Sequence, residues 1–563
     1  MRGAKTDQSQ ELITKRGGKA IRGEFLWLAL SGFIVIVLTL ASCVPATTPA
    51  ATPVPILTPT PTPSPTPTIA PTAMPTPTPS NTRGRITFVS MGESRRLPVR
   101  LLGMQALPFY ERLIDDPVKV AIVKEMTPAY LRFLDMMGNY YNWRTGQLDF
   151  NVQPNSSATY RFFAGVAEQT RKLHPQGIFI ESYYQFSQVV GAEIVLMVNL
   201  ETSSVTDQVE WFKKMNGEGI LPRNIELGNE FWLAMLGDPN VFRKWPDALT
   251  TMRVMKEYRD ALQPYFVTGT KVAVQAAASR FYVTNTGGKL VYPTALKNWD
   301  DALKPESWFS AVTIHLYPEV DRIAGAGLND TLPNNMDRVF PAAMARCDQG
   351  VDEAISAVEK QLPGKEIWIT EWSGYSWAGA TPSSQAAQRV FGQHVHLTTR
   401  MLMTFFRHPS VAMTECHMLN FSGSPMSLYR YDWQSKSYVP IGSAIILKWF
   451  DQAANGWAMY QRLKVDGAKW VSSSVTTEEG YYDVEAVQFQ KENTTTLIIH
   501  NASAEAKKVS VSGLVSGRLP TKIESAVVVP TNDYSSAAPP VREIEPTSEI
   551  ELPACSVTRM VWE

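Results

Sequence analysis

Two glutamates in this 563-residue sequence each follow a short apolar run directly. Glu230 comes after the run 224–229, and Glu371 comes after the run 367–370. A pair of carboxyl groups can cleave a glycosidic bond when one protonates the leaving oxygen and the other attacks the anomeric carbon. The charge of Glu371 would raise the pKa of Glu230, so we expect Glu230 to be the general acid/base and Glu371 the nucleophile. Asn229 precedes the acid and is placed to hydrogen-bond a sugar hydroxyl.

The elements that must position these residues are eight apolar runs, which alternate with longer amphipathic segments over roughly 360 residues. This alternation predicts a (β/α)8 TIM barrel, an α/β fold whose active site lies at the carboxyl ends of the strands. Strands four and seven are not neighbours, so their terminal glutamates would face each other across the mouth. The expected strands are 99–104, 129–134, 193–200, 224–229, 271–276, 311–316, 366–370 and 411–417. The expected helices include 118–126, 161–173, 208–215, 247–264, 351–361, 384–406 and 442–453.

The pattern changes after about residue 460, where short alternating stretches are separated by Gly, Asn and Pro. Such stretches are typical of an antiparallel β-sandwich, and the clearest are 486–490, 495–500, 508–511 and 557–562. We therefore assign 86–458 to the catalytic barrel and 459–563 to a C-terminal sandwich that braces the barrel or binds glycans. The segment 86–90 precedes the barrel and can add a strand to that sandwich.

The N-terminal region has the pattern of an export signal. Four basic residues at 15–22 precede an uncharged apolar run at 25–41, and Leu40-Ala41-Ser42-Cys43 resembles the bacterial lipobox. We expect 1–43 to be a lipoprotein signal peptide and Cys43 to be lipidated, which would place the protein on the bacterial cell surface. The alternative is an uncleaved signal anchor. The Pro/Thr-rich segment 44–85 has too little apolar content for a core and is expected to be a disordered linker.

Composition excludes some classes of partner. Lys and Arg total 53 and Asp and Glu total 53, so the formal net charge is +0 and no overall field favours nucleic acid. Four cysteines are too few for a disulfide framework. His394 and His396 are two apart in an expected helix and face different sides, so no metal site and no cofactor is expected. The expected partners are a carbohydrate and the membrane, and the sequence gives no indication of oligomeric state.

Three motifs, Gly228-Asn229-Glu230, Thr370-Glu371-Trp372 and His315-Leu316-Tyr317-Pro318, stand at the ends of strands four, seven and six. In residue type, order and strand position this resembles the clan A retaining glycoside hydrolases. The resemblance implies that Tyr317 holds the carboxylate of the nucleophile and that His315 lies in the same site.

Two further motifs narrow the resemblance within that clan. Leu131-Arg132-Phe133 on strand two and Val198-Asn199-Leu200 on strand three are similar to the α-L-arabinofuranosidases and the heparanase-like β-glucuronidases, which also carry a C-terminal β-sandwich. The resemblance implies that Arg132 and Asn199 belong to the substrate site. The chain departs from those families after strand two, where 134–139 lacks their Gly-Gly pair.

Other residues near these strand ends have two interpretations. Trp372, with Tyr375 and Trp377, follows the nucleophile and is expected to supply a sugar-stacking surface. Glu415 and His417 share one face of strand eight and can line the site or form core hydrogen bonds.

The sequence as a whole predicts a retaining glycoside hydrolase that cleaves plant or cell-surface polysaccharides or oligosaccharides. A non-catalytic carbohydrate-binding protein and a transglycosylase on the same barrel fit the same residues. A metal-dependent hydrolase is a third alternative.

Overall fold

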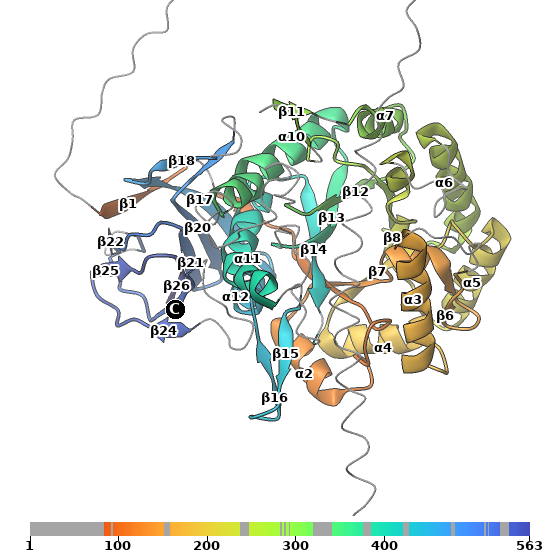
Figure 1. Ribbon diagram of the computed structural model, residues 1–563, viewed down its shortest axis with the longest axis horizontal. Helices are drawn as coiled ribbons and strands as arrows, with labels where there is room; N and C mark the ends of the chain where they lie inside the picture. Colours follow the sequence, from red (N-terminus) through yellow and green to blue (C-terminus); the bar gives the residue numbers. More distant parts are fainter. Residues whose placement is uncertain are drawn as a thin grey trace, which may run out of the picture.

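The computed structural model describes residues 84–563 apart from 92–93, 151–157, 237–246, 282–283, 287–288, 292, 319–339, 375–383, 420, 422–426, 474–478, 512–513, 516 and 530–539. Its centre is a closed barrel of eight parallel strands, which confirms the predicted fold (Figure 1). In chain order the barrel strands are β3 (Leu102–Ala106), β4 (Tyr130–Phe133), β7 (Glu193–Val198), β8 (Asn224–Leu227), β9 (Lys271–Gln275), β12 (Ala311–Leu316), β13 (Glu366–Trp372) and β14 (Val411–Leu419). Strand β14 closes the ring by pairing with β3.

The helices surround this barrel, and several begin at residues that the sequence identifies as caps. Asp116 accepts hydrogen bonds from two backbone N–H groups at the start of α2, and Ser204 accepts one, from Asp207 N–H, at the start of α5. The helices are α2 (Pro117–Met126), α3 (Ala158–Leu173), α4 (Ile180–Val190), α5 (Val205–Gly217), α6 (Ala248–Leu262), α7 (Thr294–Leu303), α10 (Val351–Gln361), α11 (Ser384–Phe405) and α12 (Ala444–Ala454). Shorter turns are η2 (Met136–Tyr140), η3 (Phe231–Leu236), η4 (Gln263–Tyr265) and the π-helical η6 (Arg346–Gly350).

The interior of the barrel changes from apolar to polar along the strands. Near the amino ends Val195, Trp368 and Met413 pack together with small residues of β9 and β12. Side chains two residues further along a strand point to the same face, so Thr370 and Glu415 lie above that apolar layer. The carboxyl end of the barrel therefore has a polar floor.

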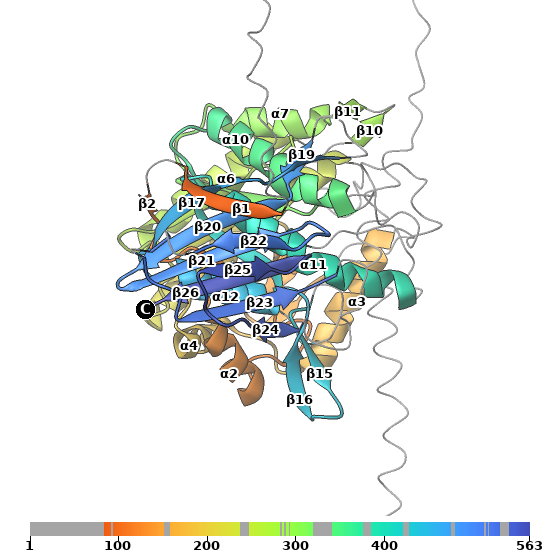
Figure 2. The same ribbon diagram turned by 90° about the vertical axis from the view of Figure 1, so that its left-hand side faces the viewer.

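The C-terminal domain is a twisted sheet folded into two layers (Figure 2). Its order is β24 (Val541–Glu543), β23 (Lys522–Val527), β26 (Ser556–Trp562), β21 (Thr494–Asn501), β20 (Val484–Lys491), β17 (Met459–Asp466), β1 (Arg85–Ser90), β22 (Lys507–Ser510) and β25 (Glu549–Leu552), with β2 (Arg95–Arg96) paired to β17. All pairs are antiparallel except β1 with β22. Leu497 and Met560 of one layer meet Val509 and Ile550 of the other in a separate hydrophobic core.

Strand β1 belongs to this sandwich although it precedes the barrel in sequence, because it pairs with both β17 and β22. The range 86–458 expected for the barrel therefore includes a sandwich strand. Two-stranded sheets complete the structure: β5 (Tyr141–Asn142) with β6 (Gln147–Leu148), β10 (Thr284–Thr286) with β11 (Lys289–Val291), β15 (Tyr429–Asp432) with β16 (Ser437–Pro440), and β18 (Trp470–Ser472) with β19 (Gly480–Tyr482).

The outer face of the sandwich sheet packs against the barrel helices. Phe489 of β20 contacts Phe406, which follows α11, at a ring-centroid distance of 5.2 Å, and Phe406 stacks on Phe450 of α12. Arg400 of α11 forms a buried ion pair with Glu485 of β20. Apolar packing and buried charge pairs together fix the two domains, so the sandwich braces the barrel.

In the part of the chain that the structure describes, no helix is long and apolar enough to cross a bilayer. The predicted signal run, Cys43 and the Pro/Thr-rich linker all lie outside the described residues.

Candidate active site

A sharp backbone turn after β8 presents Glu230. Gly228 has a φ of +72°, and a Cβ there would lie 2.3 Å from the ring of Phe231, so the turn requires glycine. Glu230 itself has a φ of 51°, in the left-handed region. Gln275 of β9 holds the turn, since its Oε1 accepts from Phe231 N–H at 2.7 Å and its Nε2 donates to Leu227 O at 3.0 Å. The neighbouring strand therefore fixes the position of Glu230.

Glu371 lies near the end of β13 and is held through both carboxylate oxygens. Arg132 donates to Oε1 at 2.7 Å, and the hydroxyl of Tyr317 donates to Oε2 at 2.8 Å. Burial alone would raise the pKa of Glu371, but the positive charges of His315 and Arg132 outweigh it and lower that pKa to about 2. Glu371 is therefore ionised at neutral pH, as a nucleophile must be.

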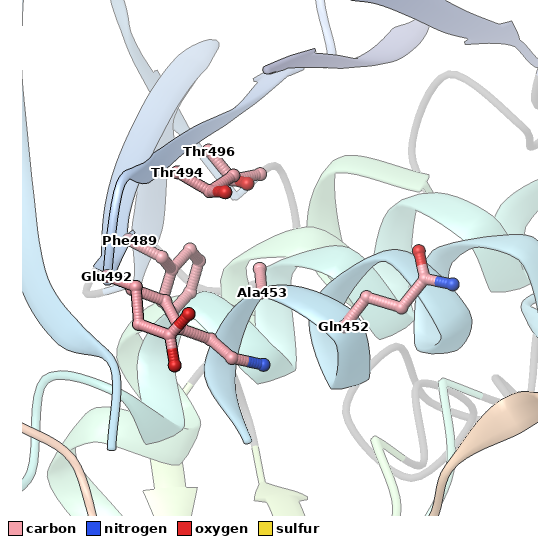
Figure 3. A pocket seen from close by; sticks show the side chains of 7 residues that line it. Gln452, Ala453, Phe489, Glu492, Thr494 and Thr496 are labelled. Carbon is pink, nitrogen blue, oxygen red and sulfur yellow. The ribbon is translucent and has the colours of Figure 1, made fainter. Parts of the chain in front are cut away.

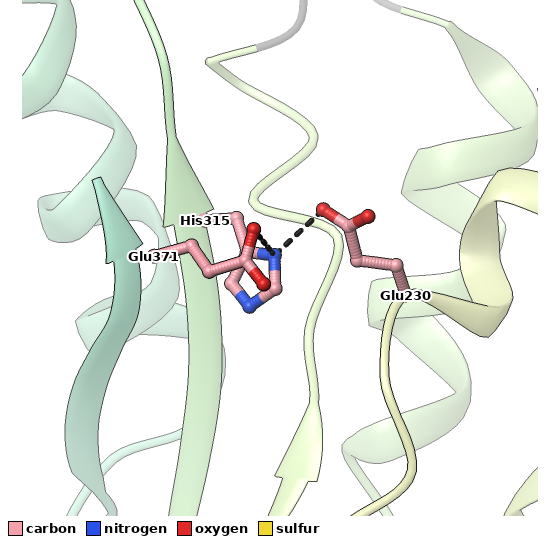
Figure 4. A group of neighbouring side chains, drawn as sticks. All are labelled: Glu230, His315 and Glu371. Atoms are coloured by element: carbon pink, nitrogen blue, oxygen red, sulfur yellow. Dashed lines mark hydrogen bonds and ion pairs between the residues drawn. The ribbon is translucent and has the colours of Figure 1, made fainter. Parts of the chain in front are cut away.

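Glu230 shares a hydrogen bond with His315, whose ring lies between the two glutamates (Figure 4). His315 Nδ1 is 2.6 Å from Glu230 Oε1, and Nε2 is 3.2 Å from the hydroxyl of Thr370. That hydroxyl donates to Glu226, so it accepts from Nε2–H and leaves Nδ1 to share a proton with Glu230. Burial raises the pKa of Glu230, the charge of His315 opposes the rise, and the charge of Glu371 adds to it.

These two glutamates and the histidine form one compact group. One ligand atom from each of Glu230, His315 and Glu371 lies within 4.8 Å of the others. The pKa of Glu230 is raised and that of Glu371 is lowered, and these opposite directions are the ones that an acid and a nucleophile need. The same three groups can also ligate a cation, although the guanidinium of Arg132 donates directly to Glu371 and would repel one.

Arg132 organises the floor of this site from β4. Its Nε donates to Glu226 at 2.7 Å, and Nη2 donates to Asn229 Oδ1 at 2.6 Å, in addition to the bond to Glu371. The two carboxylates outweigh burial and raise the pKa of Arg132. Glu226 is fully buried and pairs with Arg132, so it supports the floor of the site.

Asn139 is a site residue that the sequence analysis missed. It lies in η2 and binds the backbone of Asn229 twice, accepting from the N–H at 3.1 Å and donating to the carbonyl at 2.9 Å. The turn that carries it begins with Leu134 at a φ of 80°, followed by Asp135, which caps η2. The sequence did offer one signal for Asn139. Residues 134–139 lack the Gly-Gly pair of the similar families, so this loop had to differ from theirs.

Two side chains predicted to contact substrate lie elsewhere. Trp372 is only 1% exposed and packs against Phe405 of α11 at a ring-centroid distance of 5.1 Å, so its ring is not available to a sugar. Glu371 and Trp372 point to different sides of β13, in a segment where its pairing with β14 shifts register between Ile369 and Trp372. Asn199 donates to Tyr141 O and Thr202 Oγ1 and accepts from two backbone N–H groups, so it organises the loop after β7.

The two residues left open on strand eight differ in their surroundings. His417 is half-buried and meets the ring of Tyr317 edge-on at 5.8 Å, which places it at the site. Burial lowers the pKa of His417 to about 4, so the ring is neutral at physiological pH. Glu415 is fully buried, and burial raises its pKa well above the usual range. Tyr375 and Trp377 lie outside the described residues.

Two further basic residues of the barrel, Arg144 and Lys271, pair with acidic side chains other than Glu230 and Glu371. Arg144 forms ion pairs with Asp207 and Glu210, and Lys271 pairs with Glu366 at the amino ends of the strands. Neither faces the glutamates.

A small pocket lies on the surface between the domains (Figure 3). It is lined by Gln452 and Ala453 of α12 and by Phe489, Lys491, Glu492, Thr494 and Thr496 around the turn from β20 to β21. No barrel strand contributes to its lining, so it is a feature of the domain interface and separate from the candidate active site.

Comparisons with known proteins give the same fold. No family model and no curated protein matches the chain. A family 51 arabinofuranosidase from Xanthomonas axonopodis pv. citri is 13% identical in an alignment that covers 85% of this chain and 100% of that one, with a TM-score of 0.60. A family 51 α-L-arabinofuranosidase from Bifidobacterium longum is 14% identical over 86% of this chain and 100% of that one, with a TM-score of 0.61.

A bifunctional glucanase-xylanase from a metagenome library is 12% identical over 85% of this chain and 98% of that one, with a TM-score of 0.50. These likenesses confirm the predicted resemblance in fold to the clan A glycoside hydrolases, and to the arabinofuranosidases among them. The chain therefore has the fold of barrel glycosidases that carry a C-terminal β-sandwich.

Proposed function

We propose that the protein is a retaining glycoside hydrolase that acts on plant or cell-surface polysaccharides or oligosaccharides. The observation that carries the proposal is the Glu230–Glu371 pair, whose carboxylate oxygens lie within 4.8 Å of each other, with the pKa of Glu230 raised and that of Glu371 lowered. Retaining glycosidases place their two carboxyl groups about 5–5.5 Å apart, whereas inverting enzymes leave about 6.5–9.5 Å for a water molecule. The short separation favours retention.

In the first step, the Glu371 carboxylate attacks the anomeric carbon while Glu230 gives its proton to the leaving oxygen. The glycosidic bond breaks and an ester joins the sugar to Glu371. Arg132 and Tyr317 each donate to one oxygen of Glu371, so the attacking carboxylate is oriented before substrate arrives. Asn229 Nδ2 is buried and has no hydrogen-bond partner within the described residues, so a sugar hydroxyl that reaches it would satisfy this donor.

In the second step, Glu230 has lost its proton and takes one from water, which attacks the anomeric carbon and releases Glu371. His315 lies against Glu230 throughout and can hold a proton on Nδ1 when Glu230 is ionised. The same residue therefore serves as acid and then as base, with its proton shared by a buried neighbour.

The test uses Glu230→Ala and Glu371→Ala on aryl arabinofuranosides, xylosides, glucosides, galactosides and glucuronides, with azide as external nucleophile. We expect azide to restore turnover with retained configuration in Glu230→Ala and with inverted configuration in Glu371→Ala. Glu366→Ala is the matched control, because Glu366 lies at the opposite end of the same strand and pairs with Lys271. Full activity in either site variant would refute the assignment.

Other outcomes of the same assay identify the alternatives. Binding of glycans without cleavage by the wild type would favour a carbohydrate-binding protein, and products longer than the substrate would favour a transglycosylase. Loss of activity in a chelator would favour a cation held by the Glu230, His315 and Glu371 group.

We also propose that the protein is exported and anchored at the bacterial surface through lipidated Cys43. The proposal is supported by the basic segment, the apolar run and the lipobox-like sequence before that cysteine. Cys43→Ser should prevent incorporation of labelled fatty acid. If the variant stays in the membrane fraction at its full precursor mass and the wild type also shows no label, an uncleaved signal anchor is the better explanation.

A further inference from the structure

The hairpin formed by β15 and β16 projects from the body of the molecule between the last barrel strand and α12 (Figures 1 and 2). Trp433 stands in the turn between its strands and is 77% exposed, the highest fraction among large hydrophobic side chains of the described residues. Its neighbour in space is Tyr431, whose ring meets Trp433 at 4.8 Å and 77°. Trp433 and Tyr431 thus place two aromatic rings together at the tip of a projecting hairpin, with the ring of Trp433 open to solvent.

The turn of the hairpin is held rigidly. Asp432 accepts hydrogen bonds from the backbone N–H groups of Gln434 and Ser435 at 3.2 and 3.1 Å, and from the hydroxyl of Ser435 at 2.7 Å. On the strands, Tyr431 also contacts Tyr438 at 5.2 Å. A surface that is ordered before binding loses little conformational entropy when a ligand packs on it.

The base of the hairpin is attached to the loop that follows β3. Glu111 of that loop accepts from Phe421 N–H at 3.1 Å and forms an ion pair of 2.5 Å with Lys119. The ammonium of Lys119 lies over the rings of Phe421 and Tyr438, at 5.2 and 5.5 Å. Phe421 in turn stacks on Tyr429, the first residue of β15. These contacts fix the hairpin relative to the barrel.

The same loop reaches the active site through the residue before Glu111. The hydroxyl of Tyr110 donates to Asp135 at 3.0 Å, at the carboxyl end of β4. Burial and then the nearby charge of Glu371 raise the pKa of Asp135 to about 6, so Asp135 lies within electrostatic range of the nucleophile. One loop thus contacts the surroundings of Glu371 on one side and the aromatic hairpin on the other.

We propose that Trp433 and Tyr431 form a stacking platform for a sugar unit of a polymeric glycan, several residues along the chain from the bond cleaved at Glu230 and Glu371. This inference rests on the proposed function and names its substrate class as a polysaccharide. One face of a sugar ring exposes mainly C–H groups, and these pack on an aromatic face, while the ring hydroxyls stay in water. The hairpin follows β14, the barrel strand that carries His417, in the sequence.

The other strongly exposed tryptophans are poorer candidates. The guanidinium of Arg96 lies 4.5 Å from the ring of Trp457 and covers one face. Trp470 packs closely over Gly480 and meets Tyr482 edge-on, on a small sheet of the C-terminal domain. Neither belongs to a loop that follows a barrel strand.

The test compares Trp433→Ala with Trp470→Ala, a matched removal of an exposed tryptophan. The polymer is soluble arabinan, xylan or β-glucan, and the aryl glycoside that the wild type cleaves decides which. On this polymer Trp433→Ala should lower kcat/KM about tenfold. On the aryl glycoside its kcat/KM should stay within about twofold of the wild type. Trp433→Tyr should recover most of the loss, and Trp470→Ala should match the wild type on both substrates.

Equal rates of Trp433→Ala and wild type on the polymer would overturn the platform, as would an equal loss on both substrates. A concentration-dependent dimer that disappears in Trp433→Ala would assign the hairpin to self-association instead. If the wild type cleaves nothing, the proposed function fails. The platform is then tested separately by electrophoresis of each variant in gels with and without the polymer. The polymer should slow the wild type and Trp470→Ala and should leave the migration of Trp433→Ala unchanged.

Discussion

Replacing Arg132 by lysine keeps a positive charge in the floor of the site but removes the planar guanidinium, whose three nitrogens donate in three directions. The guanidinium donates to Glu226, Glu371 and Asn229 through three different nitrogens, at 2.7, 2.7 and 2.6 Å. An ammonium is a compact point charge that cannot reach three acceptors in this arrangement, so at least one bond to a buried polar group is lost. A hydrogen bond to a charged group contributes about 1.5–3 kcal/mol.

We therefore expect Arg132→Lys to lower the free energy of unfolding by about 3 kcal/mol, since removing a partner from a buried pair costs about 3–5 kcal/mol. The carboxylate of Glu371 also loses its fixed orientation. We expect kcat/KM on an aryl glycoside to fall about 100-fold, which corresponds to about 2.7 kcal/mol of transition-state stabilisation. Denaturant unfolding and steady-state kinetics on the same preparation measure the two effects.

A second variant separates charge from geometry. Arg132→Met removes a positive charge that lowers the pKa of Glu371. The pKa of Glu371 should therefore rise. On acidification, the variant should lose activity at a higher pH than the wild type. In Arg132→Lys this acid limb should move much less. Arg144→Lys is the surface control and should leave both stability and kinetics unchanged. Wild-type kcat/KM and wild-type unfolding in Arg132→Lys would refute the reasoning.

Three further predictions follow from the site. Asn139→Ala removes both bonds to the backbone of Asn229 and should lower kcat about tenfold with little change in the far-ultraviolet circular dichroism; an unchanged kcat would contradict the positioning role. The kcat/KM of the wild type should fall as pH rises, because the raised pKa of Glu230 marks the loss of the acid's proton, and should persist to low pH because the pKa of Glu371 is about 2. Trp372→Phe should lower the melting temperature and leave KM unchanged, whereas a large rise in KM would restore the substrate-stacking role.

Much of the barrel could be predicted because its strands are buried on both faces and read as apolar runs. The expected segment 311–316 coincides with β12, and most other strand predictions differ from the structure by one to three residues at an end. Helices α4 and α7 were not predicted. In α4 the buried positions Ile180, Tyr183 and Phe186 repeat at helical spacing, but polar and aromatic residues between them weaken the contrast on which the periodicity depends.

The candidate site divides in a similar way. Glu230, Glu371 and Tyr317 were identifiable because each ends a strand, and a strand end has one location in a barrel. Trp372 was placed in the site because it follows Glu371 in sequence, and Asn199 because of the resemblance on strand three. Adjacency to Glu371 does not fix the direction of a side chain, because Thr370 on one side of it reaches the site and Trp372 on the other packs against α11. Asn139 acts on Asn229 from another loop, a contact that no local pattern encodes.

Backbone strain links these observations. Leu134, Glu230 and Ala278 have φ values of 80°, 51° and 46°, and they follow β4, β8 and β9 at the same end of the barrel. Left-handed conformations of such residues cost about 1–3 kcal/mol each and persist only where the surroundings hold them. Gln275 supplies that support for the turn of Glu230, and Asn139 for the segment before it. These three strained loops lie at one rim of the barrel and lower its stability. The proposed site requires them because Glu230 must lie at a fixed distance from Glu371.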